Sequence, residues 1–219
     1  MYAGHLAPIL PLFKMYPNVS PFVFSFGVGF LDYVFGFLSI YGYEGLSLNP
    51  EAGRMGVDIN VTYSHSIVGT ILLSSIYGMM TGTFLPGFLA SASHFVGDWL
   101  VHNDDLYLDP FTKAVVGGIG LWGSYPIFSY YFELICCLVC FYFSERDVPT
   151  LAAMCYILYI HFTMRPNATT LAGELLKVPE QERGIQTCKA MVIYFTIPAV
   201  IIGSILTYGN SLKRKNKQF

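Results

Sequence analysis

The chain has 219 residues, of which 54% are hydrophobic, 16% aromatic and only 12% charged, and its net charge at pH 7 is −2. Soluble domains carry about 25% charged residues, so a water-soluble surface would need large exposed apolar patches. The slightly acidic balance also lacks the basic surface of a nucleic-acid-binding protein. We therefore expect one integral membrane bundle whose solvent is the lipid bilayer, with no nucleic acid partner.

A membrane-spanning helix needs about 20 largely apolar residues. Residues 2–16 are apolar but short, and Pro8 and Pro11 interrupt them, so we expect a kinked or partly inserted helix there. Six longer apolar segments follow at 20–43, 61–82, 85–103, 124–144, 148–164 and 189–208. The predicted fold is all-α, a polytopic transmembrane bundle of about six to seven helices.

Polar loops at 44–60, 104–123 and 166–187 separate these spans. All three fall on one side of the bilayer if the first helix crosses it, and the basic tail of Lys213, Arg214, Lys215 and Lys217 falls on the other. Lys and Arg divide equally between the sides, so the tail alone indicates the cytoplasmic or matrix side. We expect no removable presequence and a bacterial-type inner membrane or the mitochondrial inner membrane.

Several ionisable residues occupy the predicted spans, where charges are costly and usually face the bundle interior. The six deepest are His5, Asp32, His65, His94, Asp98 and Glu133. At about 1.5 Å per helical residue they lie between roughly 6 and 17 Å from the same side, although successive spans run in opposite directions. This distribution predicts a shared polar pocket that opens toward the three polar loops.

The spacing of His94 and Asp98 places an imidazole and a carboxylate on one helix face, a common beginning of a metal site. His65 from the neighbouring span would complete the set, and Asp32 or His5 would add a ligand or orient one. We predict a divalent metal, zinc or manganese, with His5, Asp32, His65, His94 and Asp98 as its ligands. Asp32 and Asp98 are also the candidate catalytic acids, because either carboxylate could serve as a base.

Simpler interpretations exist for the individual residues. A lone histidine within a membrane is more often a hydrogen-bonded packing residue than a metal ligand. Glu133 could be a helix-packing clasp to a tyrosine or histidine, His102 is most simply solvated, and His161 is most simply structural. The acidic residues of loop 104–109 are more typical of a solvated loop than of a cation site.

The order of these motifs resembles a known family. His5, Asp32, Ser64-His65-Ser66 and Ser93-His94-Phe95-Val96-Gly97-Asp98 are similar to the pattern of the bacterial membrane-bound metal-dependent hydrolases. The chain also resembles uncharacterised multi-pass bacterial membrane proteins. The resemblance covers residues 1–145 and implies a hydrolase-like helical core there, with His5, Asp32, His65, His94 and Asp98 as its site. Residues 146–219 would add further transmembrane helices and the basic tail to the same bundle.

The chain also departs from the hydrolase pattern. Asn60 and Val61 stand where the family has a His-Arg pair, and Gly97 replaces a leucine. A family member that had lost its chemistry would fit these changes. The alternative function is therefore a non-catalytic accessory subunit of a large membrane complex, such as a mitochondrial respiratory assembly. A transporter fits less well, because no internal repeat is present.

Overall fold

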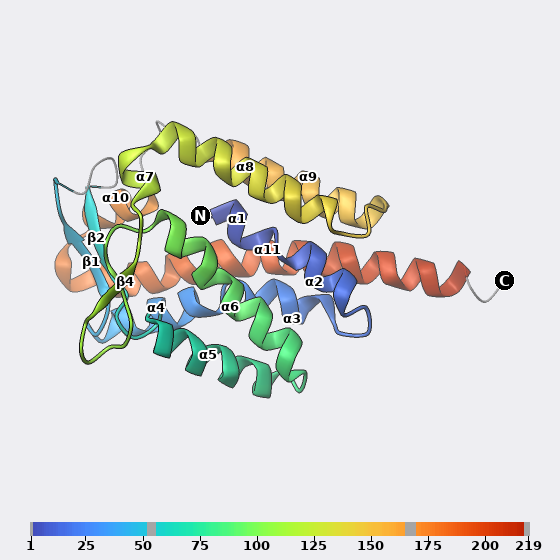
Figure 1. Cartoon of the computed structure of the whole chain (residues 1–219), viewed down its shortest axis with the longest axis horizontal. Helices are drawn as coiled ribbons and strands as arrows, with labels where there is room; N and C mark the ends of the chain where they lie inside the picture. Colours follow the sequence, from blue (N-terminus) through green and yellow to red (C-terminus); the bar gives the residue numbers. More distant parts are fainter. Residues whose placement is uncertain (1, 52–55, 165–169, 217–219) are drawn as a thin grey trace.

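The computed structural model describes residues 2–51, 56–164 and 170–216. In chain order its elements are α1 (Tyr2–Leu6), α2 (Ile9–Met15), α3 (Pro21–Gly27), α4 (Phe30–Ile40), β1 (Gly45–Leu48), β2 (Val57–Asn60), α5 (Ile67–Met80), α6 (Phe84–Val101), β3 (Leu106–Tyr107), β4 (Val115–Gly117), α7 (Leu121–Ser124), α8 (Pro126–Tyr142), α9 (Val148–Thr163), α10 (Leu171–Leu176) and α11 (Glu180–Asn216) (Figure 1). The chain is mostly helical, as predicted. It is not all-α, because β1–β2 and β3–β4 form two antiparallel hairpins.

Helices occur at every predicted span, but most are shorter than predicted. Among the described residues, only Glu180–Lys213 of α11 is both long and apolar enough to cross a bilayer, and the bent pair α3–α4 would add a second span if counted as one. Helices α5, α8 and α9 have 14, 17 and 16 residues. By this length criterion the predicted number of six to seven spans was too high, because the predicted segments included residues outside the helices, such as 61–66 before α5.

The predicted span 20–43 contains a bend of 45° between α3 and α4. Gly29 lies at this bend, and a Cβ placed there would meet the ring of Phe195 at 2.6 Å. A second close contact lies at Gly27, where an added Cβ would stand 2.6 Å from Cβ of Ala90 on α6. The two glycines therefore let the bent helix pack closely against both α11 and α6.

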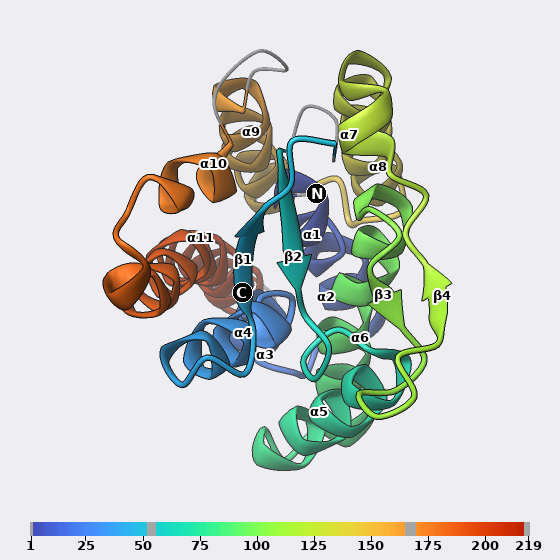
Figure 2. The same ribbon diagram turned by 90° about the vertical axis from the view of Figure 1, so that its left-hand side faces the viewer.

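The first segment, left uncertain by the sequence, forms the centre of the bundle. Figure 2 looks along the bundle and shows α1 surrounded by α4, α6, α8, α9 and α11. The break between α1 and α2 lies beside Pro8, as its missing N–H predicts. Leu6, Ile9 and Leu10 are fully buried, so this segment supplies much of the core.

Helices α5 and α6 form an antiparallel hairpin. Gly82 makes the turn between them with φ +66°, a conformation that glycine adopts without strain. Gly78 and Gly87 bring the two backbones together, because a Cβ on Gly87 would lie 2.9 Å from Cα of Gly78. Within the hairpin, Ser74 donates a hydrogen bond of 2.9 Å to Ser91. This packing fixes the position of α6, which carries His94 and Asp98.

The two β hairpins and α10 gather at one end of the bundle (Figures 1 and 2). The described parts of all three predicted polar loops are therefore on the same side. Residues 52–55 and 165–169 of these loops, and the side chains of the basic tail after Lys213, lie outside the described residues. In the β1–β2 hairpin Leu46 pairs with Ile59, so their side chains point to the same face of the hairpin.

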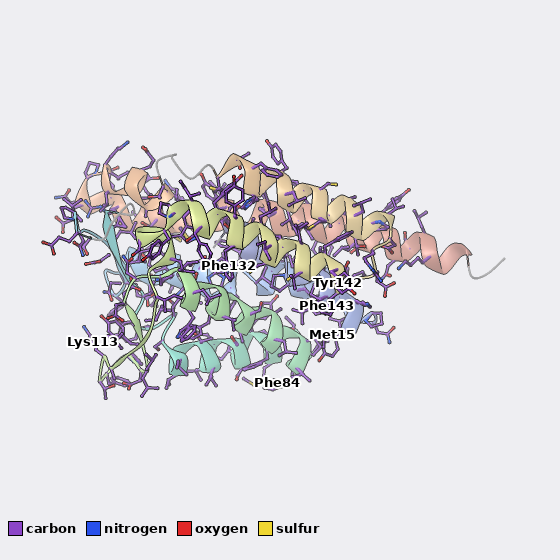
Figure 3. The ribbon with its side chains drawn as sticks, turned by 45° about the horizontal axis from the view of Figure 1, so that its top comes forward. Met15, Phe84, Lys113, Phe132, Tyr142 and Phe143 are labelled. Atoms are coloured by element: carbon purple, nitrogen blue, oxygen red, sulfur yellow. The ribbon has the colours of Figure 1, made fainter. Side chains whose placement is uncertain are left out.

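The outer surface of the bundle is strongly apolar. On α8 alone, Ile127, Phe128, Tyr131, Ile135, Leu138, Val139 and Tyr142 are exposed. Figure 3 shows Met15, Phe84, Tyr142 and Phe143 near the end of the bundle opposite Lys113. The first four of these side chains are between 51% and 63% exposed, so aromatic and aliphatic groups cover this end.

Candidate metal centre

The five predicted site residues meet in one buried cluster. Asp98 is its centre: its Oδ1 lies 2.9 Å from Nε2 of His5, and its Oδ2 lies 3.0 Å from Nε2 of His94 and 3.4 Å from Nε2 of His65. Asp32 approaches the same group from the other side, 3.4 Å from His94 and 3.7 Å from His65. The predicted convergence of these residues is confirmed.

Each side chain is delivered by a different local structure. His94 and Asp98 are one turn apart on α6, as their spacing predicted. Asp32 lies in the first turn of α4, where the helix dipole favours a carboxylate. His65 was expected one turn inside a helix, but it lies in the loop just before α5. Ser66 is the N-cap of that helix and accepts a hydrogen bond from the Gly69 N–H.

His5 reaches the cluster because α1 occupies the bundle centre. Its ring stacks on that of His94 with 3.9 Å between centroids and 9° between planes. The neighbouring residue Gly4 donates its N–H to Oε1 of Glu133 at 2.8 Å. This amide belongs to the first turn of α1, where helical backbone donors lack partners within the helix. Glu133 on α8 therefore anchors the helix that carries His5.

Outer hydrogen bonds orient two of the imidazoles. The carbonyl of Val28 accepts a hydrogen bond of 2.6 Å from Nδ1 of His94. A carbonyl can only accept, so this contact places a proton on Nδ1 and leaves Nε2 as the other ring donor or ligand. Nδ1 of His65 lies 2.6 Å from Oγ of Ser64. Such contacts on the outer nitrogen are typical of metal-binding histidines, because they fix the ring orientation and the tautomer.

The arrangement fits a divalent cation. The ligand atoms of His5, His94 and Asp98, and those of Asp32, His65 and His94, each lie within 4.8 Å of one another. Donors at 2.0–2.2 Å from a tetrahedral zinc ion are separated by about 3.4 Å. The contacts of His65 with both carboxylates and of His94 with Asp32, at 3.4–3.7 Å, are close to this value, whereas Asp98 lies at hydrogen-bond distance from His5 and His94. Two carboxylates with neutral imidazoles would also balance a charge of +2, which buried charges require. These buried His and Asp groups could hold a metal ion.

His102 was interpreted as solvated, and this is wrong. Its side chain is only 12% exposed, and its Nδ1 contacts Oδ1 of Asp105 at 3.0 Å. Its Nε2 lies 3.8 Å from Asp98, too far for a hydrogen bond. His102 therefore borders the cluster and links it to the β3–β4 region. His94, Asp98 and His102 are spaced i, i+4, i+8, which places His102 on the same helix face as the two candidate ligands. Its position at the end of the predicted span 85–103 favoured contact with water instead.

Glu44 is a further residue that the sequence did not identify. Its Oε1 accepts the backbone N–H groups of Tyr63 and Ser64 at 2.7 and 2.8 Å, and its side chain is almost fully buried. Burial raises the pKa of Glu44 more than these two hydrogen bonds lower it. Glu44 thus holds the loop that presents His65. No sequence pattern relates a residue before β1 to a loop after β2, so only the fold could reveal this contact.

A cavity of about 270 Å³ adjoins the cluster. His5, Asp32, His65, Asp98 and His102 form one part of its wall. Most of the remaining wall is apolar and includes Phe35, Leu46, Ile59, Val101, Leu175 and Phe195. The described part of the chain after residue 146 contributes α10 and α11 to this wall, so it shapes the surroundings of the cluster as well as the bundle.

Searches against protein-family models, curated proteins and solved structures find no match to this chain.

Proposed function

We propose that this chain is a multi-pass membrane protein that binds one zinc or manganese ion in the Asp32–Asp98 cluster and acts as a metal-dependent hydrolase. The observation that carries the proposal is the environment of His94. The Val28 carbonyl occupies its Nδ1, while its Nε2 faces carboxylate oxygens of both Asp32 and Asp98. With a proton already on Nδ1, a neutral His94 would direct a lone pair at two anions. Either a second proton on His94 or a cation between these groups removes that repulsion, and metal content distinguishes the two.

The residues suggest a division of roles. Asp98 has the most histidine contacts and is the best placed ligand, with His5, His65 and His94 around it. A divalent metal would supply Lewis-acid polarisation of an acyl or phosphoryl oxygen and activation of water. Asp32 has longer contacts, a side chain 18% exposed and a position on the cavity wall, which suit a general base that accepts the proton of water.

The outer surface supports several membrane crossings. The apolar side chains of α8 are continued by exposed Val68, Ile71, Leu72 and Met79 on α5. Helices α6 and α8 have 18 and 17 residues, equivalent to about 26 Å at 1.5 Å per residue. A hydrocarbon core of about 30 Å can thin locally to match such helices. The compartment, a bacterial-type or mitochondrial inner membrane, is part of the proposal.

Metal content tests the proposed function. Full-length protein purified in detergent without added chelator should carry about one zinc or manganese ion per chain, as measured by elemental mass spectrometry. The double variant His65→Ala/His94→Ala should lose it. Ile157→Val/Ile202→Val is the matched double control, since these two fully buried core residues lie outside the cluster and their substitution should leave metal content unchanged.

The opposite result, a protein without bound metal, would contradict the proposed function. Metal-free wild-type protein, with the same thermal stability as the double variant, would contradict a metal centre. It would favour the alternative of a non-catalytic accessory subunit, whose apolar outer surface would be covered by partner subunits as well as lipid. A native gel then distinguishes the two, because an accessory subunit migrates with an assembly of much larger mass.

A further inference from the structure

The cavity beside the cluster has walls of two kinds. One part carries the candidate metal ligands, and much of the rest is formed by apolar side chains from α4, both strands of the first hairpin, α10 and α11. A sugar or nucleotide would leave most of its hydrogen-bonding groups unpaired against such a wall, which is unfavourable for each buried group. The wall instead matches a hydrocarbon chain.

The hairpin and the short helix at the end of the bundle form part of the wall of this cavity. The paired residues Leu46 and Ile59 line it from the hairpin, and Leu171 and Leu175 line it from α10. Leu171 and Leu175 are one turn apart and therefore share a helix face. The side chains of Glu174 and Lys177 at α10 are 52% and 67% exposed and pair with each other. Helix α10 is thus apolar toward the cavity and polar on its outer face, as expected at a membrane–water boundary.

A second, polar cavity of about 970 Å³ lies next to the first. Ile59, Asn103 and Asp105 line both cavities, so these three residues separate an apolar space from a polar one. Four of the candidate metal ligands, His5, Asp32, His65 and Asp98, line the apolar cavity. The boundary lies near the cluster, because Asp105 contacts His102, whose Nε2 is 3.8 Å from Asp98. A molecule with a hydrocarbon chain and a polar group would fit both spaces, with the bond between its two parts near the cluster.

We propose that the substrate is a long-chain acyl ester, with its hydrocarbon chain in the apolar cavity and its alcohol portion toward the polar cavity. This inference rests on the proposed hydrolase function. In the reaction, the oxygen of water forms a bond to the acyl carbon, and the bond from that carbon to the alcohol oxygen breaks. One proton of water passes to Asp32 and then to the departing alkoxide. The products are a fatty acid and an alcohol, and no redox partner is required.

Chain binding is tested first, without hydrolysis. The protein has two tryptophans: Trp122 lines the cavity, and Trp99 is 41% exposed on α6. We use 12-bromododecanoic acid, whose bromine quenches nearby indole fluorescence, on full-length protein in detergent. In a Trp99→Phe background, Trp122 should be quenched saturably. In a Trp122→Phe background, Trp99 should show only the weaker quenching caused by probe dissolved in the micelle.

A matched pair of substitutions locates the bound chain. Ala172 on α10 lines the cavity, and Ala152 on α9 is exposed outside it. Ala172→Phe should abolish saturable quenching of Trp122 by filling the cavity, whereas Ala152→Phe should leave it unchanged. Trp122 quenching that is absent, or that persists equally in Ala172→Phe, would overturn the proposal.

The ester is tested with 4-nitrophenyl dodecanoate and 4-nitrophenyl acetate. Metal-loaded protein should favour the longer ester in kcat/KM on the order of tenfold or more, and Ala172→Phe should remove that preference while retaining the metal and acetate hydrolysis. Equal rates for both esters, insensitive to Ala172→Phe, would overturn the acyl-chain inference alone. Chain binding without hydrolysis of either ester would overturn the hydrolase function and the ester with it.

Discussion

Oε1 of Glu133 on α8 accepts a hydrogen bond of 2.8 Å from the backbone N–H of Gly4, the residue next to His5. An acid in the second half of the chain therefore holds the first helix in register with the cluster. Nδ1 of His161 on α9 lies 3.7 Å from the other carboxylate oxygen of Glu133. The predicted packing contact between this acid and a histidine is therefore present in the structure.

The Glu133 contact predicts a loss of metal affinity at a distance. Glu133→Ala removes the acceptor of the Gly4 N–H and loosens the helix that carries His5, so it should reduce metal affinity by up to about 10–100-fold, the effect of losing a direct outer contact to a ligand. Glu133→Gln keeps an acceptor oxygen and should retain most of the affinity. Competition with a metal-chelating dye measures both. Equal loss in the two variants would mean that the charge of Glu133, and not its hydrogen bond, matters.

Substitutions of Ser64 and Ser66, which are separated by one residue, should have different effects on metal affinity and on stability. Ser64→Ala removes the partner of His65 Nδ1 and should also weaken metal binding about 10–100-fold. Ser66→Ala removes the N-cap of α5 and should instead lower the free energy of unfolding by about 1 kcal/mol. Metal competition and denaturation of each variant separate the two effects. Similar metal affinities for both variants would show that Ser64 does not orient His65.

Glu44 predicts a pH dependence. Because its pKa is raised in the folded protein, its contribution to stability is present below the unfolded pKa of about 4.3 and is lost as pH rises through the folded pKa. Glu44→Gln cannot ionise and keeps an acceptor for the Tyr63 and Ser64 amides. The variant should therefore equal or exceed the wild type in stability at pH 7. Thermal unfolding between pH 4 and 8 measures this, and a steeper decline in the variant would contradict it.

Asp147 combines a helix cap with an ion pair. Its Oδ1 accepts the Thr150 N–H at 3.0 Å, and its Oδ2 lies 2.6 Å from Nζ of Lys213. Asp147→Ala should cost about 1 kcal/mol through the lost cap of α9, whereas Asp147→Asn keeps a cap and should cost less. Chemical denaturation at neutral pH compares them.

The ionisation of Asp147 gives this prediction a pH control. Burial alone would raise the pKa of Asp147, but hydrogen bonds from Lys213 and Thr150 outweigh it and lower the pKa. The contribution of its charge is therefore present above the unfolded pKa of about 3.9 and is lost as pH falls through the folded pKa. The difference in free energy of unfolding between the wild type and Asp147→Asn should therefore decrease as pH falls through the folded pKa of Asp147. If this difference in free energy of unfolding does not change with pH, the ion pair with Lys213 is not its cause.

Cysteine labelling tests the membrane crossings. Cys155 is exposed on α9, so in water it would react with a membrane-impermeant maleimide. In intact membranes, a variant that retains only Cys155 should resist this reagent and react after the membrane is dissolved in SDS. A cysteine introduced by Lys113→Cys in the loop before β4 should react when the reagent reaches that side. Equally fast reaction of both cysteines in sealed and opened vesicles would contradict a membrane position for α9.

The pattern of the sequence identified the residues of the candidate site but not their supports. Asp32, His65, His94 and Asp98 stood out because ionisable groups are rare among apolar segments, and their helical depths indicated a common level. His65 was nevertheless assigned to a helix, because the predicted span began at Val61, whereas α5 begins only after its N-cap Ser66. The hydrogen bonds by which Glu44 holds the His65 loop and the Val28 carbonyl orients His94 could not be recognised in the sequence. Neither a backbone carbonyl nor a contact between loops produces a periodic pattern of residues.

Composition and apolar periodicity by themselves determined a mostly helical chain with an apolar exterior, because these properties are local and additive along the sequence. Only the tertiary structure decided three other features: the bend at Gly29, the central position of α1, and the two cavities that meet at Ile59 and Asn103. They depend on how closely distant helices approach one another, and that distance is set by side-chain packing across the bundle, as where Gly27 meets Ala90.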